Sequence, residues 1–290
     1  MDKIDFKSNL KVSVIIPTYN RPRTLRKVIK SYILSCDELI IINDGSTKDY
    51  SLTINFIKKE CEKYRKNFKY IQNKKRKGSG YSRNVGLRYT SFNLVLFSDD
   101  DIFISSNYIS ECIRTLYKYN ASVVGGRIIY LEDKKNLSQA PIIDLSILEG
   151  NFSISPEKNY LEVPFLHVVS LWDLNRTFRK GVRFFPYYFV NGYREETDPM
   201  IQVTKKGGKI LFISHIKCYH LPKNKIERGG QKRVIRLIYW LFIHFNNLIF
   251  LIRHYRYLRK LTKSFLLTVW LKRILNLRIL PFEKTKKFFY

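Results

Sequence analysis

The stretch Leu94-Val-Leu-Phe-Ser-Asp99-Asp100-Asp101 joins an apolar run, typical of a buried strand, to three consecutive carboxylates. Carboxylates repel one another where water cannot screen them, so this strand end needs a compensating cation. Alternate residues of an extended segment point to the same side, so Asp99 and Asp101 can act together. Two carboxylates with phosphate oxygens form the environment that Mg²⁺ or Mn²⁺ prefers. A solvated acidic turn is the alternative interpretation.

Earlier apolar runs also end in polar residues. Residues 12–16 precede the cluster 17–20, and residues 38–42 precede the cluster 43–46. Apolar residues at helical spacing lie between these runs, which predicts an α/β fold with a doubly wound, mainly parallel sheet flanked by helices. Ligands bind beyond the carboxyl ends of the strands in such sheets. We therefore expect the two clusters and residues 99–101 to form one site.

A basic, glycine-containing loop precedes the acidic stretch. It reads Lys74-Lys-Arg-Lys-Gly78-Ser-Gly80-Tyr-Ser-Arg83-Asn-Val-Gly86. Glycines permit a tight loop, and the free amides of a helix start attract anions, a field to which the cations add. The loop is typical of a diphosphate cradle, with an ordinary solvated loop as the alternative.

A further polar cluster occurs in the second half, Asn191-Gly-Tyr-Arg-Glu195-Glu196-Thr-Asp198-Pro199. Asp198 can cap a helix that begins at Pro199. The two glutamates exceed what capping requires, and either could act as a general base facing the aspartates. Residues 131–162 show no clear periodicity and are interpreted as a loop-rich, substrate-facing insert.

The composition indicates a globular protein with an excess of positive charge. Of 290 residues, 45% are apolar, and 53 Lys and Arg stand against 24 Asp and Glu, giving a net charge of +29. Such a chain is attracted to nucleic acid, anionic membranes or phosphorylated substrates. The four scattered cysteines suggest neither a disulfide framework nor a zinc site. Together with the absence of an apolar signal sequence in residues 1–11, they predict a cytoplasmic location.

The C-terminal quarter is the most basic part of the chain. Residues 234–252 are almost as apolar as a membrane span, but Arg236, His244, Asn247 and His254 fall on one stripe of the helix. This pattern favours an amphipathic helix on an anionic membrane surface over a spanning one, with packing on the catalytic domain or in a dimer as the alternative. We expect a domain of residues 1–222 followed by a basic helical region, 223–290, peripheral on the cytoplasmic face of the membrane.

The order of the motifs resembles the GT-A glycosyltransferases of family 2. The matching pieces, within residues 11–220, are Ser13-Val-Ile-Ile-Pro-Thr-Tyr-Asn-Arg21, Ile42-Asn-Asp44-Gly-Ser-Thr47, Gly80-Tyr-Ser-Arg-Asn-Val-Gly86, Phe97-Ser-Asp-Asp-Asp101 and Arg194-Glu-Glu-Thr-Asp198. The resemblance implies a GT-A fold. It also implies a metal-dependent, inverting hexosyltransferase that moves a sugar from a nucleoside-diphosphate donor to an acceptor hydroxyl or phosphate. The acceptor could be a lipid-linked glycan.

The resemblance also implies roles for individual residues. Those expected to bind the donor are Pro17, Thr18, Tyr19, Asn20, Arg21, Asp44, Gly80, Arg83, Asp99 and Asp100. Asp99 and Asp101 match the DxD motif and, with His220, would hold Mg²⁺ or Mn²⁺. The family usually carries Glu-Asp, with the aspartate as the base. The position of that aspartate is filled here by Glu196, and Glu195 and Asp198 are the alternatives.

Other functions fit parts of the sequence. A nucleotidyltransferase on a similar sheet would release pyrophosphate, whereas a glycosyltransferase would release a nucleoside diphosphate. A non-catalytic relative would keep the motifs without turnover. The charge of +29 also suggests a nucleic-acid-binding protein, but the basic residues do not form a known reading motif.

Overall fold

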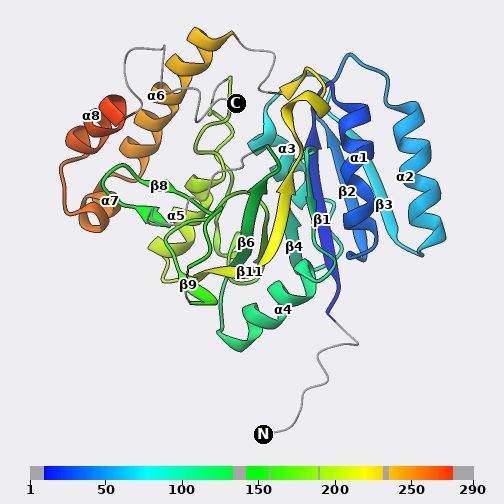
Figure 1. Cartoon of the computed structure of the whole chain (residues 1–290), viewed down its shortest axis with the longest axis horizontal. Coiled ribbons are helices and arrows are strands. Elements are labelled where there is room, and N and C mark those ends of the chain that lie inside the picture. The colour runs from blue at the N-terminus through cyan, green and yellow to red at the C-terminus, as the bar shows by residue number, and fades with distance from the viewer. Residues whose placement is uncertain (1–9, 133–141, 157, 189, 231–234, 277–290) are drawn as a thin grey trace, which may run out of the picture.

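A mixed sheet forms the centre of the molecule (Figure 1). The computed structural model describes residues 10–276 except 133–141, 157, 189 and 231–234. Within these residues the strand order is β3-β2-β1-β4-β10-β6-β11-β5, and β9 also pairs with β11. The strands are β1 (Val12–Thr18), β2 (Glu38–Asn43), β3 (Asn67–Gln72), β4 (Leu94–Phe97), β5 (Ile102–Ile104), β6 (Val123–Tyr130), β9 (Tyr160–Glu162), β10 (Ser170–Asp173) and β11 (Ile210–His220). A separate hairpin joins β7 (Ile143–Asp144) to β8 (Glu149–Gly150).

The first four strands along this order are parallel, as the sequence predicts. Ile15 of β1 lies between Ile40 of β2 and Phe97 of β4, and these strands are buried along their whole length. Burial on both faces explains why their sequences are continuous apolar runs. Strand β10 is antiparallel to its neighbours β4 and β6, which makes the sheet mixed. The expected fold class is therefore confirmed.

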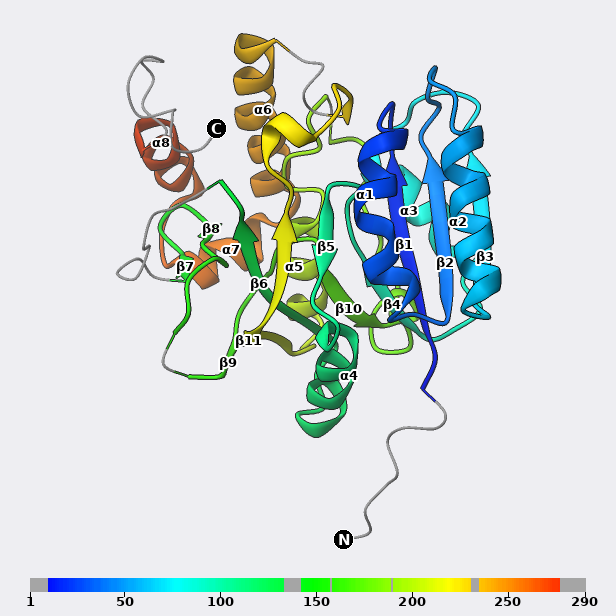
Figure 2. The same ribbon diagram turned by 45° about the vertical axis from the view of Figure 1, so that its right-hand side comes forward.

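Helices cover both faces of the sheet. They are α1 (Pro22–Ile33), α2 (Ser51–Lys63), α3 (Ser79–Leu87), α4 (Tyr108–Lys118) and α5 (Thr197–Lys205). In Figure 2, α1 and α2 lie in front of strands β1–β3, and α3 lies behind them. Helix α5 begins at Thr197, two residues earlier than predicted. Asp198 therefore lies in the first turn of the helix rather than at its cap.

Three helices follow the sheet, α6 (Arg236–Arg253), α7 (Tyr255–Thr262) and α8 (Leu266–Asn276). No helix in the described part of the chain is long and apolar enough to cross a membrane. Helix α6 buries His244, Asn246 and Asn247, whereas Phe245 and Leu248 are exposed. Of the polar stripe predicted for this segment, His244, Asn247 and His254 are buried against the protein. The boundary between residues 222 and 223 stays a prediction, and both outer ends of the two predicted regions lie outside the described residues.

Candidate functional site

A pocket of about 630 Å³ opens at the carboxyl ends of β1, β2 and β4. Its lining comes from seven chain segments that are far apart in sequence. The lining residues are Pro17, Thr18, Tyr19, Arg21, Asp44, Arg76, Lys77, Gly78, Ser79, Tyr81, Asp99, Asp100, Asp101, Pro186, Tyr187, Tyr188, Val190, Asn191, Gly192, Glu195, His220 and Gly230. The polar strand ends predicted to share a site are therefore brought together, because parallel strands end at one edge of the sheet.

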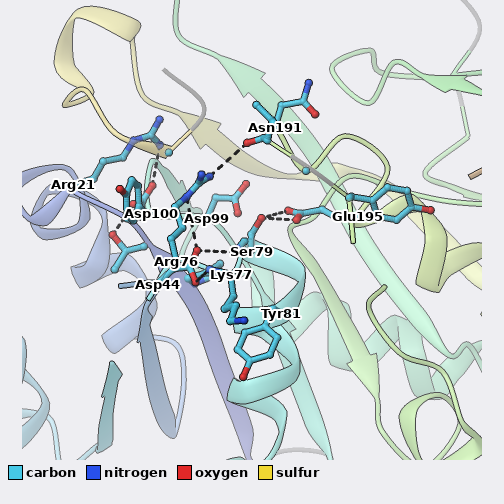
Figure 3. A pocket seen from close by; sticks show the side chains of 18 of the residues that line it. Arg21, Asp44, Arg76, Lys77, Ser79, Tyr81, Asp99, Asp100, Asn191 and Glu195 are labelled. Carbon is cyan, nitrogen blue, oxygen red and sulfur yellow. Dashed lines mark hydrogen bonds and ion pairs between the residues drawn. The ribbon is translucent and has the colours of Figure 1, made fainter. Parts of the chain in front are cut away.

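Asp100 and Asp101 pair with a buried arginine on the loop after β1. Arg21 Nη1 lies 3.0 Å from Asp100 Oδ1 and 2.8 Å from Asp101 Oδ2, and Figure 3 shows the Asp100 contact. Thr18 Oγ1 also donates to Asp100 at 2.7 Å. Burial, with Asp101 beside it, raises the pKa of Asp100 to about 7 although Arg21 acts to lower it. Arg21 thus supplies the compensating cation for two of the three consecutive carboxylates.

Asp44 holds the basic loop in place. Asp44 Oδ1 accepts hydrogen bonds from the Lys77 amide and from Ser82 Oγ, and Oδ2 accepts one from the Gly78 amide at 2.8 Å. Gly78 adopts φ +94°, a left-handed conformation that favours glycine. The guanidinium of Arg76 lies over the Tyr19 ring, 4.8 Å from its centroid. A role for Asp44 toward a base or ribose stays a prediction.

Arg83 joins the two acidic sides of the pocket. Its Nη2 lies 2.6 Å from Asp99 Oδ1 and its Nη1 lies 2.6 Å from Glu195 Oε1. Ser79 Oγ and the Gly80 amide also donate to Glu195, and Figure 3 shows the contact with Ser79. Arg83 is only 1% exposed and does not line the pocket. It therefore compensates the carboxylates from beneath, and contact with a diphosphate stays a prediction.

The three base candidates lie in different environments. Glu195 lines the pocket but already accepts from Arg83, Ser79 and Gly80. Glu196 follows directly in the chain; its side chain is partly buried and, like that of Asp198, is not among the pocket-lining residues, and no ion pair joins it to a cation among the described residues. Burial, and then the charge of Glu195, raise the pKa of Glu196 to about 7. A base near neutral pKa is well matched to abstract a proton from a hydroxyl.

Asp198 does not line the pocket. Its Oδ2 accepts from Tyr188 Oη at 2.6 Å and from Arg253 Nε at 2.9 Å, and it lies 3.1 Å from His254 Nε2. Burial alone would raise the pKa of Asp198, but the contacts with His254 and Arg253 outweigh burial and hold it well below its usual range. Such a carboxylate is a poor proton acceptor, so the geometry argues against Asp198 as the base and for an anchoring role.

The metal candidates are only partly assembled. His220 Nδ1 lies 2.9 Å from the Leu221 carbonyl, which can only accept, so Nδ1 is the donor of this hydrogen bond. The other ring nitrogen, Nε2, lies 3.6 Å from Asp101 Oδ1. Asp99 is engaged by Arg83. No group of three or more His, Cys, Asp or Glu side chains is arranged to hold a metal within the described residues.

Two predicted donor-binding residues act behind the pocket. Asn20 adopts φ +56°, and its Oδ1 accepts from the Thr47 and Lys48 amides, so it fixes one loop to the next. Gly80 contributes its amide to Glu195. A Cβ on Gly80 would lie 3.3 Å from the Phe185 carbonyl, so the close approach favours glycine.

Several lining residues were not predicted from the sequence. Among them are Arg76, Ser79, Tyr187, Asn191 and Gly230. Arg76 and Ser79 belong to the basic loop, and Asn191 belongs to the cluster before α5, so a local signal existed for them. Tyr187 follows a segment without periodicity. Gly230 comes from the C-terminal region, and no local pattern connects it with the strand ends.

Comparison with known proteins adds independent evidence. The model of the family described as Glycosyl transferase family 2 matches residues 13–182. The poly(ribitol-phosphate) beta-N-acetylglucosaminyltransferase TarP of Staphylococcus aureus (strain N315) is 30% identical over 259 residues, and the match covers 77% of this chain and 76% of TarP. The GalNAc(5)-diNAcBac-PP-undecaprenol beta-1,3-glucosyltransferase of Campylobacter jejuni is 34% identical over 134 residues, covering 44% of this chain and 41% of that protein.

Among solved structures, residues 1–349 of S. aureus TarS in complex with UDP-GlcNAc superpose with a TM-score of 0.60. The identity is 18%, and the match covers 87% of this chain and 74% of that chain, which shows a shared fold. Two other curated relatives are much longer, and the chain spans only 13% and 20% of their length. The loop of residues 191–198 lies beyond the segment matched by the family model.

Proposed function

The chain belongs to glycosyl transferase family 2, a family of glycosyltransferases, and we propose that it moves a sugar from a nucleoside-diphosphate donor to an acceptor with inversion at the anomeric carbon. One observation carries the proposal. Arg83 holds Asp99, at the end of β4, and Glu195, on the loop before α5, next to each other at one pocket. A donor site beside carboxylates that can take a proton is the arrangement that an in-line displacement requires.

We assign the base to Glu196, with Glu195 as the alternative. The raised pKa of Glu196 supports this assignment, and Glu195 would have to give up its contacts with Arg83 and Ser79 before it could take a proton. Thr18, Tyr19, Asp44 and the loop of residues 76–81 line the other side, where we place the nucleotide. The cations of Arg76 and Lys77 suit a diphosphate.

Mg²⁺ or Mn²⁺ fits beside Asp101 and His220. The two facing atoms, Asp101 Oδ1 and His220 Nε2, suit a divalent cation that takes its remaining ligands from water and the donor phosphates. Asp99 would join them if it parted from Arg83. When bound, the cation would neutralise charge on the leaving nucleoside diphosphate.

The acceptor is proposed from the relatives and the surface. TarP is named for poly(ribitol phosphate), and the C. jejuni relative for an undecaprenol-linked glycan. Both names point to a polymeric or lipid-linked acceptor. Such an acceptor agrees with an enzyme that rests on an anionic membrane, a location that the exposed apolar residues of α6 and the basic residues of α7 support.

The proposal is tested by product analysis with a panel of nucleotide sugars, with UDP-GlcNAc included, in the presence and absence of Mn²⁺. We expect release of a nucleoside diphosphate that depends on the metal and increases with poly(ribitol phosphate) or an undecaprenyl-diphosphate glycan. Asp101→Ala should abolish this turnover, since it removes a metal ligand. Pyrophosphate release from nucleoside triphosphates would instead support a nucleotidyltransferase, and full turnover by Asp101→Ala would contradict the metal assignment.

A further inference from the structure

Helix α6 directs polar side chains at the loop of residues 191–198, here called the base loop. Asn246 Nδ2 donates to Asn191 Oδ1 at 2.9 Å, and Asn191 Nδ2 donates to the Tyr239 carbonyl at 2.9 Å. Asn246 and Asn247 are at most 1% exposed. Most buried side-chain amides make at least one hydrogen bond. The start of the base loop is therefore attached to α6.

The middle of the base loop contains a strained residue. Arg194 adopts φ +75°, which is disfavoured for a residue with a Cβ, and it directly precedes Glu195. Such a conformation persists only where surrounding contacts hold it. Arg194 Nε donates to Asn247 Oδ1 at 2.9 Å, Nη1 donates to the Leu148 carbonyl at 2.6 Å, and the guanidinium lies 4.9 Å from the centre of the Phe250 ring. Helix α6 supplies two of these three contacts.

The far end of the base loop is attached to the same helix. Arg253 and His254, at the C-terminal end of α6, contact the buried Asp198 at 2.9 Å and 3.1 Å. Helix α6 thus contacts the base loop at Asn191 and Arg194, before the two glutamates, and at Asp198, after them. Both glutamates project from backbone that is held on either side.

We propose that Asn247 is a positioning residue for this reaction: its carbonyl oxygen fixes Arg194 and, through it, the backbone that carries Glu195 and Glu196. The inference rests on the proposed function. A guanidinium can only donate, so the oxygen of Asn247 must face Arg194. The amide nitrogen of Asn247 is buried without a hydrogen-bond partner among the described residues. The carbonyl oxygen is therefore the atom on which the contact depends.

Two substitutions separate the effect of the Asn247 oxygen from the effect of the side-chain volume. Asn247→Leu keeps a similar volume but removes the acceptor, and it should lower kcat about 10- to 100-fold, the effect of a small misplacement of a catalytic group. Donor KM and UDP affinity by calorimetry should stay near the wild-type values, because Thr18 and Asp99 belong to other elements. Asn247→Asp keeps an oxygen toward Arg194 and should restore most of the activity.

Leu251→Ala is the matched control, since Leu251 is buried on the same helix and has no polar side-chain atom. It should lower the melting temperature without lowering kcat per folded molecule. Full kcat in Asn247→Leu, or an Asn247→Asp variant as impaired as Asn247→Leu, would overturn the inference. If Asn247→Leu does not fold, Asn247→Ser, whose side chain is shorter, replaces it with the same expectation.

Hydrogen exchange tests the role of Asn247 independently of the proposed function. The amides of residues 191–198 should exchange faster in Asn247→Leu than in wild type or Asn247→Asp, whether or not a donor has been found. If wild type turns over no nucleotide sugar, the proposed function fails. The exchange result alone then decides whether Asn247 holds the base loop. Equal exchange in the three proteins would show that Asn247 does not hold the loop.

Discussion

Glu195 and Glu196 are neighbours in sequence but differ in their surroundings. Glu195 is paired with Arg83, whereas no cation pairs with Glu196 within the described residues. The charged or titratable groups that act on Glu196 are Glu195, Asp99 and Arg83, and its charge in turn affects Tyr239 on α6. Among these groups only Arg83 favours the ionised form, and burial opposes it more strongly. The carboxyl is thus kept protonated up to a pH at which a base is useful.

The raised pKa of Glu196 predicts how turnover depends on pH. If Glu196 is the base, it must be ionised, so kcat should rise with pH and reach half of its maximum near pH 7. Initial rates of nucleoside diphosphate release at saturating donor measure this profile. Glu196→Gln should lose activity at every pH. A half-maximal rate near pH 4.5, the ordinary value for a glutamate, would assign the base to another group.

The same shift affects stability with a defined sign. The pKa of Glu196 is higher in the folded than in the unfolded chain, so its protonated form favours folding. That contribution is fully present below about pH 4.5 and is lost as the pH rises through about 7. Ionisation of Glu196 therefore costs stability in the pH range in which the carboxylate would work. This is typical of a functional rather than a stabilising carboxylate.

At the scale of elements, the segment after β11 holds the first pocket loop. Glu227 Oε2 accepts from the Thr24 amide at 2.9 Å, and the Glu227 amide donates to Thr24 Oγ1 at 2.9 Å. The Gly229 carbonyl accepts from Arg21 Nη2 at 3.1 Å. A Cβ on Gly229 would lie 2.5 Å from the Tyr19 carbonyl, so the two backbones approach closely. Residues of the predicted C-terminal region thus complete the pocket wall beside Tyr19 and Arg21.

Glu227 should therefore stabilise helix α1 from a distance. The first turn of α1 contains no acidic residue and no side-chain cap, and Glu227 supplies both an acceptor and a negative charge. Glu227→Ala should lower the free energy of unfolding in urea by about 1 kcal/mol and raise the donor KM. Lys225→Ala is the control, because Lys225 contacts α1 only through its backbone carbonyl. An equal loss in both variants would contradict the capping role.

At the scale of the whole molecule, α6 buries polar side chains and exposes apolar ones. His244, Asn246 and Asn247 are buried, and Leu241, Phe245, Leu248 and Ile252 are between 40% and 67% exposed on the outer side of the helix. Basic residues follow on α7, and the chain carries a net charge of +29. An apolar surface flanked by cations suits the interface of an anionic membrane.

This surface predicts binding to lipid vesicles. The protein should sediment with vesicles that contain anionic lipid, and the double variant Leu241→Ser/Phe245→Ser should bind about tenfold more weakly, because each apolar side chain contributes on insertion. Leu52→Ser is the control, since Leu52 is 77% exposed but lies on α2. Sedimentation of the double variant equal to that of wild type would instead favour contact between protein copies, which light scattering would detect.

The parts of the fold that could be predicted are those that depend on residues close together in the sequence. The buried strands, their parallel arrangement and the polar strand ends are local patterns, because a strand buried on both faces must be apolar along its length. The order of these segments was sufficient to predict a mainly parallel sheet and the gathering of residues 17–20, 43–46 and 99–101 at one edge. The start of α5 differs from the prediction because the two signals of a helix start, Asp198 and Pro199, lie inside its first turn.

The sequence by itself therefore determined the sheet, the site at its edge and the identity of the acidic groups there. Only the tertiary structure decided their contacts and their burial. Arg83 meets Asp99 and Glu195, which are 16 and 112 positions away, and Asn247 meets Arg194 across 53 positions. The protonation and orientation of a carboxylate depend on such distant partners and on burial. Local spacing cannot specify either, so the assignment among Glu195, Glu196 and Asp198 required the folded chain.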